Sequence, residues 1–161
     1  MEITIFVIIT VICLAFTSFG DLRDRMIYTA PIIALHVLWA LYLWSSGMYT
    51  SQFLMAFWTA QLVVYITLNC MNVWGGGDSD LYMLLGDICL VACKGASPET
   101  VAITICISLV AGLVVAILIG KIEFWHKGNK LQRDSSLAVA PGLAVVMTVL
   151  LAKAWIWMVI I

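Results

Sequence analysis

Two short clusters of aspartate contain the side chains best suited to chemistry in this chain. Asp21 and Asp24 follow a long apolar stretch, and Asp78 and Asp80 follow a run of three glycines. When two carboxyl groups face each other, one can hold a proton while the other activates water, and the pair can then hydrolyse a peptide bond. The clusters therefore predict a paired-carboxylate site, provided that the fold brings them together.

Each cluster taken alone has a simpler interpretation. The first could be a charged flank that anchors the end of a helix, and the second could be a flexible loop with a solvated acid. Gly75, Gly76 and Gly77 favour more than a turn, because glycine tolerates backbone angles that other residues avoid and lets another segment approach closely. We therefore expect this run to admit an extended peptide to the carboxylate of Asp78.

The elements that carry these clusters are predicted to be membrane-spanning helices. Apolar residues make up 64% of the 161 residues and charged residues 11%, whereas soluble domains are nearer half and a quarter. A helix needs about 20 apolar residues to cross a bilayer, and its backbone must satisfy its own hydrogen bonds there. We therefore expect an all-α, polytopic membrane helix bundle with about six transmembrane helices, formed by a single domain over residues 1–161. The apolar runs lie at 3–19, 27–46, 52–73, 81–94, 100–119 and 137–160, and the fourth is short.

The basic residues between these runs predict the orientation. Alternate connections place most of them on one side, which the positive-inside rule makes cytoplasmic, so both termini are expected outside the cytoplasm. The two aspartate clusters are two spans apart and should open on the same cytoplasmic face. The net charge of −1 gives no reason to expect a nucleic-acid partner. The basic residues on the cytoplasmic side are Arg23, Arg25, Lys121, Lys127, Lys130 and Arg133, against Lys94 in the opposite connections.

A few polar residues in the apolar runs have weaker claims to function. Asp80, Asp87 and Lys94 recur every seven residues and therefore share one face of the fourth helix. That face could line a wet cavity near the site or face the bundle interior, and we favour a structural or solvating role. His36, in the middle of the second run, is expected to be a hydrogen-bonded interior residue rather than a catalyst.

Three short sequence motifs are spread over nearly the whole chain. They are Asp-Leu-Arg-Asp-Arg-Met-Ile at 21–27, Gly-Gly-Gly-Asp at 75–78 and Ala-Pro-Gly-Leu-Ala at 140–144. In this order they resemble the type IV prepilin peptidases, and more narrowly the short form of Tad-type pilus systems. The resemblance implies an intramembrane aspartyl peptidase in the cytoplasmic (inner) membrane that removes the basic leader from pilin-like precursors. Its catalytic carboxylates would be Asp21 and Asp78, with no metal or cofactor required.

The sequence departs from the family pattern at two places. Tyr28-Thr29 stands where Pro-Asn is common, and Asp80 stands where a lysine is common. We expect Asp24 and Asp80 to be auxiliary, forming with the catalytic pair an acidic rim that attracts the leader. Two other functions stay open: a catalytically weakened pilus-assembly subunit, suggested by Asp80, and a small ion transporter component. The expected partners are a pilin-like precursor, the lipid bilayer and pilus or secretion machinery.

Overall fold

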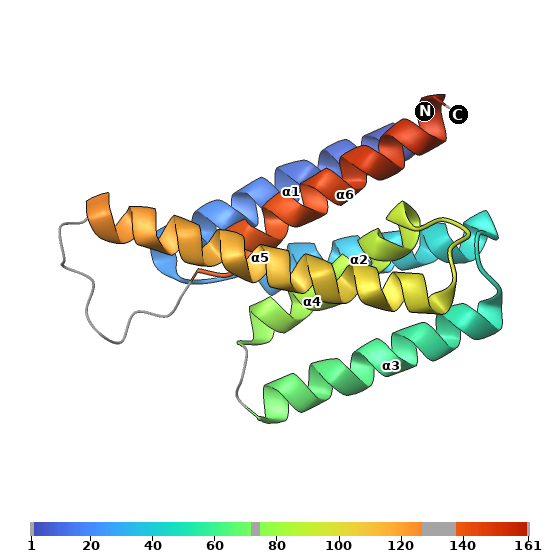
Figure 1. Cartoon of the computed structure of the whole chain (residues 1–161), viewed down its shortest axis with the longest axis horizontal. Coiled ribbons are helices and arrows are strands. Elements are labelled where there is room, and N and C mark those ends of the chain that lie inside the picture. Colours follow the sequence, from blue (N-terminus) through green and yellow to red (C-terminus); the bar gives the residue numbers. More distant parts are fainter. Residues whose placement is uncertain (1, 72–74, 127–137, 161) are drawn as a thin grey trace.

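Six α helices make up the regular structure of the described residues. The computed structural model describes residues 2–71, 75–126 and 138–160, and no strand occurs among them. This confirms the predicted all-α fold (Figure 1). The helices are α1 (Glu2–Asp24), α2 (Thr29–Ser46), α3 (Ser51–Cys70), α4 (Gly76–Ala92), α5 (Pro98–His126) and α6 (Ala140–Ile160).

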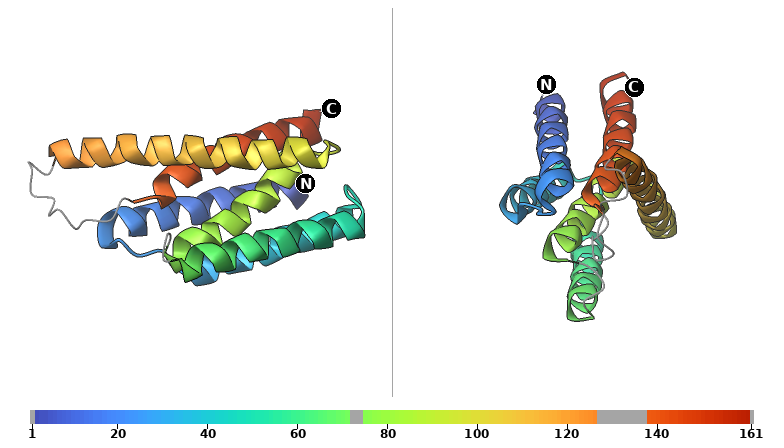
Figure 2. Two further views of the ribbon diagram at one scale, coloured as in Figure 1. Left: turned by 60° about the horizontal axis from the view of Figure 1, so that its bottom comes forward. Right: turned by 90° about the vertical axis from the view of Figure 1, so that its left-hand side faces the viewer.

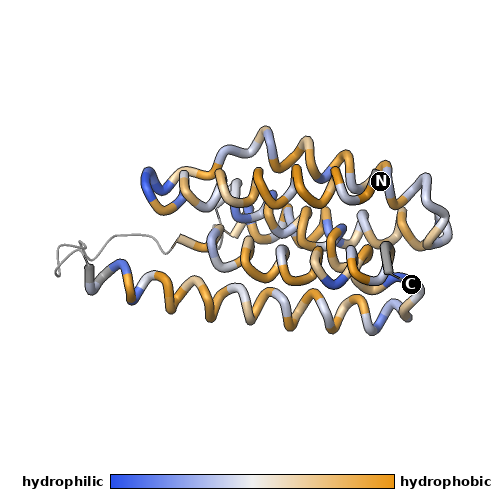
Figure 3. Tube along the Cα trace, turned by 90° about the horizontal axis from the view of Figure 1, so that it is seen from above, coloured by the Kyte–Doolittle hydropathy of each residue, from blue (hydrophilic) through white to orange (hydrophobic). Residues whose placement is uncertain are grey.

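Five of these helices are long and apolar enough to cross a membrane, as expected for a multi-pass membrane protein. The exception is α4, which has 17 residues and carries three aspartates, so the expected fourth span is a shorter and more polar helix than the others. Apolar residues lie along all six helices, and the most hydrophilic segments gather toward the helix ends (Figure 3). Most of the outward-facing side chains on α1 and α5 are large and apolar, which suits contact with lipid.

The short helix α4 is the centre of the bundle. From Ser79 to Ala92 every residue of α4 except Met83 is buried. The helix packs against α2, α3, α5 and α6, while α6 also packs along α1 and α5 (Figure 2). In contrast, α3 contacts chiefly α4, and its only buried residues are Leu54 and Gln61.

Glycine makes the crossing of α5 and α6 close. A Cβ atom added to Gly142 in α6 would lie 2.1 Å from the backbone oxygen of Gly112 in α5. Real Cβ contacts are never that short, so the two backbones can meet at this distance only because Gly142 has no side chain. The close crossing holds the start of α6 in place, next to the end of α1.

Both aspartate clusters lie within helices rather than in the connections between them. Helix α1 continues to Asp24, and α4 begins at Gly76, five residues before the apolar run that the sequence marks. Hydropathy marks the length of helix that sits in hydrocarbon, and a helix can extend beyond that length with polar residues. The clusters therefore have helical geometry, which decides the directions in which their side chains point.

Candidate functional site

Three helix ends meet at one end of the bundle and position the candidate site. The chain alternates in direction, so the end of α1 and the starts of α4 and α6 lie at the same end (Figure 1). Asp21 is in the last turns of α1 and only 6% exposed. Asp78 is in the first turn of α4 and partly buried. The structure thus brings together the two acids that the sequence singles out, 57 positions apart in the chain.

The carboxylate of Asp21 is held by the start of α6. The backbone N–H of Ala140 donates a hydrogen bond to Asp21 Oδ2 over 3.0 Å. The first N–H groups of a helix have no partner within it and carry a partial positive charge, so they favour an anion at this position. Pro141, the next residue, has no N–H to leave unpaired in this first turn. The Ala-Pro-Gly motif therefore supplies a backbone donor to the first aspartate.

The carboxyl group of Asp78 senses both burial and the neighbouring acid. Burial, and then the negative charge of Asp21, raise the pKa of Asp78 from 3.8 to about 6, while the backbone N–H of Gly75 opposes the shift. Like charges raise a carboxyl pKa only when they are close in a poorly solvated place. Asp21 and Asp78 are therefore electrically coupled, and Asp78 keeps its proton to a higher pH than an ordinary carboxyl group does.

Of the three glycines before Asp78, only Gly77 is closely packed, and none of the three has a positive φ. Gly75 has a φ of −69°, and the glycines with positive φ among the described residues are Gly47 and Gly95, so the expectation of unusual angles was wrong. The expectation of close approach holds at Gly77, where an added Cβ would lie 2.5 Å from the Cβ of Ile27. The α1–α2 connection therefore rests directly on the first turn of α4, which ties the Asp21 motif to the Asp78 motif.

The other two aspartates have different surroundings, and of the expected acidic rim the structure contradicts only the place of Asp80. Asp24 is exposed at the end of α1, where its Oδ1 lies 3.7 Å from Arg23 Nε. Asp80 is 8% exposed and faces the Tyr65 hydroxyl of α3. Two residues of helix turn a side chain by about 200°, so Asp78 and Asp80 point to opposite sides of α4. The sequence alone treated them as one cluster because the glycine run resembled a loop.

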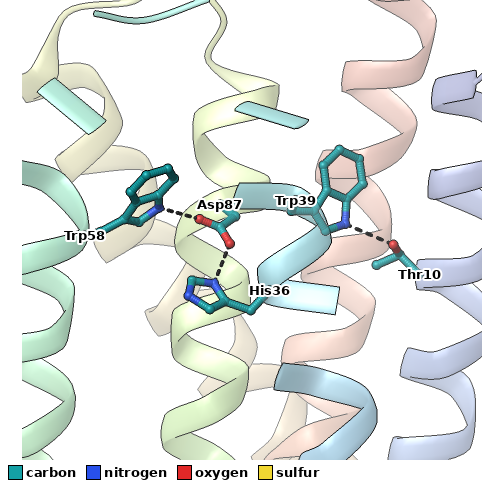
Figure 4. Close-up of polar contacts among 5 residues, drawn as sticks. All are labelled: Thr10, His36, Trp39, Trp58 and Asp87. Carbon is teal, nitrogen blue, oxygen red and sulfur yellow. Dashed lines mark hydrogen bonds and ion pairs between the residues drawn. The ribbon is translucent and has the colours of Figure 1, made fainter. Parts of the chain in front are cut away.

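A second polar cluster lies deeper in the bundle, around the carboxylate of Asp87. This residue is fully buried; its Oδ2 lies 2.5 Å from His36 Nδ1 of α2, and its Oδ1 accepts a 3.0 Å hydrogen bond from Trp58 Nε1 of α3 (Figure 4). The predicted hydrogen bonding of His36 is confirmed, and Asp87 faces the bundle interior, which was one of the two alternatives for its face of α4. Their pairing was not predicted, because periodicity within one helix does not identify its partner on another.

An ion pair also missed by the sequence analysis borders the site. Arg25 Nη2 lies 2.7 Å from Glu123 Oε2, joining the α1–α2 connection to the end of α5. Arg25 has a φ of 53°, a left-handed conformation that ends α1 and turns the chain toward Ile27. Both residues lie in segments that the sequence treated only as basic or charged flanks.

Comparison of the chain with protein-family models, curated proteins and solved structures finds no match. The case for a function therefore depends on the motifs and on the geometry of these helix ends.

Proposed function

We propose that the chain is an aspartyl peptidase that removes the basic leader from pilin-like precursors, with Asp21 and Asp78 as its catalytic pair. The observation that supports this most strongly is the electrostatic coupling of two carboxyl groups from α1 and α4 at one end of the bundle. Two such groups, one charged and one protonated, are what hydrolysis by an acid–base pair needs. The motif resemblance supports the same pair and adds the class of substrate.

The unequal environments of the two acids suggest their roles. The Ala140 N–H stabilises a charged Asp21, whereas Asp78 keeps its proton more readily. In the proposed mechanism Asp21 takes a proton from a water molecule as the water oxygen attacks the peptide carbonyl carbon, and Asp78 protonates the carbonyl oxygen. The tetrahedral intermediate then collapses: one of its hydroxyl groups returns a proton to Asp78, the C–N bond breaks, and the proton on Asp21 passes to the leaving nitrogen. The pair titrates as a unit, so its measured pKa values belong to both residues.

The proposed substrate has an apolar helix in the bilayer and a basic leader in the cytoplasm, and it is cut just after a glycine near the membrane surface. The proposal places the protein in the cytoplasmic (inner) membrane with both termini outside the cytoplasm, following the distribution of basic residues. Pilus or secretion machinery would then use the processed pilin. Asp24 and Asp80 are auxiliary in this scheme, since Asp24 is exposed at the end of α1 and Asp80 faces Tyr65.

The test is cleavage of a pilin precursor with a basic leader by the purified protein in detergent, followed by the mass of the product. Asp21→Asn and Asp78→Asn should each lower the rate by about 10²- to 10⁴-fold, because an amide cannot exchange the required proton. The double variant should be hardly slower than either single variant, since the residues act as a unit. Glu99→Gln, an exposed acid at the other end of the bundle, is the matched control and should keep full activity.

Three results would contradict the proposal. Substantial turnover by either single asparagine variant would remove the aspartyl pair, and loss of wild-type activity with a strong chelator would indicate a metal enzyme. A wild-type protein that binds the precursor without cutting it would instead be an assembly subunit.

A further inference from the structure

Helices α2 and α3 both pack on α4 and leave a groove between them. The groove has a volume of about 270 Å³, near the lower end of the range for small-ligand pockets, so it suits one side chain rather than a whole helix. It lies on the side of α4 opposite Asp78 and does not belong to the site described above. Among the described residues, the lining consists of Ile33 and His36 from α2, Leu62 and Tyr65 from α3, and Asp80 and Met83 from α4.

The lining divides into an apolar part and a charged end. Ile33, Leu62 and Met83 supply only carbon and sulfur surface. The charged end is the carboxylate of Asp80, a residue that is 8% exposed and that receives a hydrogen bond from Tyr65. A carboxylate has about four acceptor positions, so one hydroxyl leaves most of them unused. A nearly buried carboxylate with so few donors is costly at membrane depth, and a cation from outside would relieve that cost.

Among the described residues that line the groove, no lysine or arginine neutralises Asp80. Its nearest positive candidate is His36, whose Nδ1 is already engaged by the fully buried Asp87 at 2.5 Å. Even a protonated His36 gives one positive charge to two carboxylates, Asp80 and Asp87. The carboxylate of Asp80 therefore lies next to an apolar wall, and this arrangement is the complement of a long aliphatic side chain with a cationic tip.

The geometry points to the groove as a binding site for the lysine side chain of a peptide segment lying against α2 and α3. The four-carbon stem would lie along Ile33, Leu62 and Met83, and the ammonium group would reach Asp80. Lysine suits the groove better than arginine, because Tyr65 already occupies part of the carboxylate and hinders the two-pronged contact that a guanidinium prefers. The site faces away from Asp21 and Asp78, so this inference does not depend on the proposed peptidase activity.

Binding can be measured on the full chain in detergent with protein carrying ¹³C-labelled tyrosine. The probes are n-butylammonium, n-butylguanidinium and neutral n-butanol at constant ionic strength, read from the Tyr65 signal, which Tyr65→Phe identifies. We expect saturable binding of butylammonium, weaker binding of butylguanidinium and none of butanol. Asp80→Asn should weaken butylammonium binding by about ten-fold or more, as for loss of a charge-assisted hydrogen bond. Asp24→Asn removes the same charge outside the groove and should leave the affinity unchanged.

A second set of probes separates a peptide from a free amine. An apolar peptide with one lysine should bind, whereas the same peptide with norleucine at that place should not. Leu62→Trp fills the groove without changing its charge and should block both probes, which keeps the test decisive if Asp80→Asn does not fold. Equal binding by wild type and Asp80→Asn, or binding of butylammonium without the lysine peptide, would overturn the inference.

Discussion

Replacing Asp78 with asparagine should stabilise the folded protein at neutral pH and leave its stability in acid unchanged. The folded-state pKa of Asp78 is about 6 and its ordinary value is 3.8, so the folded protein holds the proton of Asp78 more tightly than the unfolded chain does. The stability contributed by this group is fully present below pH 3.8 and is lost as the pH rises through about 6. An asparagine side chain does not titrate, so its variant escapes this loss.

The size of the effect follows from the shift. A rise of about 2 units corresponds to about 3 kcal/mol at about 1.4 kcal/mol per unit, which is an upper limit. Asp78 is only partly buried, and solvent weakens the interaction, so we expect a gain of about 1 to 2 kcal/mol above pH 7. The gain should shrink below pH 6 and vanish near pH 4.

The assay is unfolding of the purified protein in mixed micelles with increasing sodium dodecyl sulfate, followed by circular dichroism from acidic to mildly alkaline pH. Asp24→Asn is the matched control, because Asp24 is exposed and its replacement should change stability little at any pH. In a protein that carries Asp21→Asn and keeps Asp78, the loss of stability caused by ionisation of Asp78 should occur at lower pH. The negative charge of Asp21, which helps to raise the pKa of Asp78, is absent from that variant. A gain equal at all pH values, or a loss at neutral pH, would refute the described environment of Asp78.

Two further substitutions test the packing. Asp87→Asn should destabilise the bundle by about 1 to 3 kcal/mol, because the buried carboxylate joins α2 and α3 to α4 and an amide nitrogen would face a hydrogen-bond donor. An unchanged unfolding midpoint in the same sodium dodecyl sulfate titration would show that these contacts are not formed. Gly142→Ala should cost about 1 to 3 kcal/mol, since its Cβ would meet the Gly112 oxygen. A Cβ added at Gly76 would have nothing within 4 Å, so Gly76→Ala should leave the stability unchanged. Equal losses of stability in Gly142→Ala and Gly76→Ala would contradict the close crossing of α5 and α6.

Much of the fold follows from hydropathy, whereas contacts between helices do not. The alternation of six apolar runs correctly places Asp21 and Asp78 at one end, because each passage through the bundle reverses the direction of the chain. Alternation cannot tell which residues meet there, so the bond from Ala140 to Asp21 was not predicted. The separation of Asp78 from Asp80 would have followed from helical geometry had α4 been expected to begin at the glycines.

The position of α4 along the chain has a consequence for how the protein is made. This helix is short, and its three aspartates make it a poor candidate to enter a bilayer by itself. Its polar partners His36 and Trp58 belong to α2 and α3, which leave the ribosome before it. When α4 emerges, the groups that will receive Asp87 are therefore already synthesised. A substitution that removes His36 of α2 or Trp58 of α3 would therefore act during translation. It would prevent α4 from inserting, before the bundle has formed.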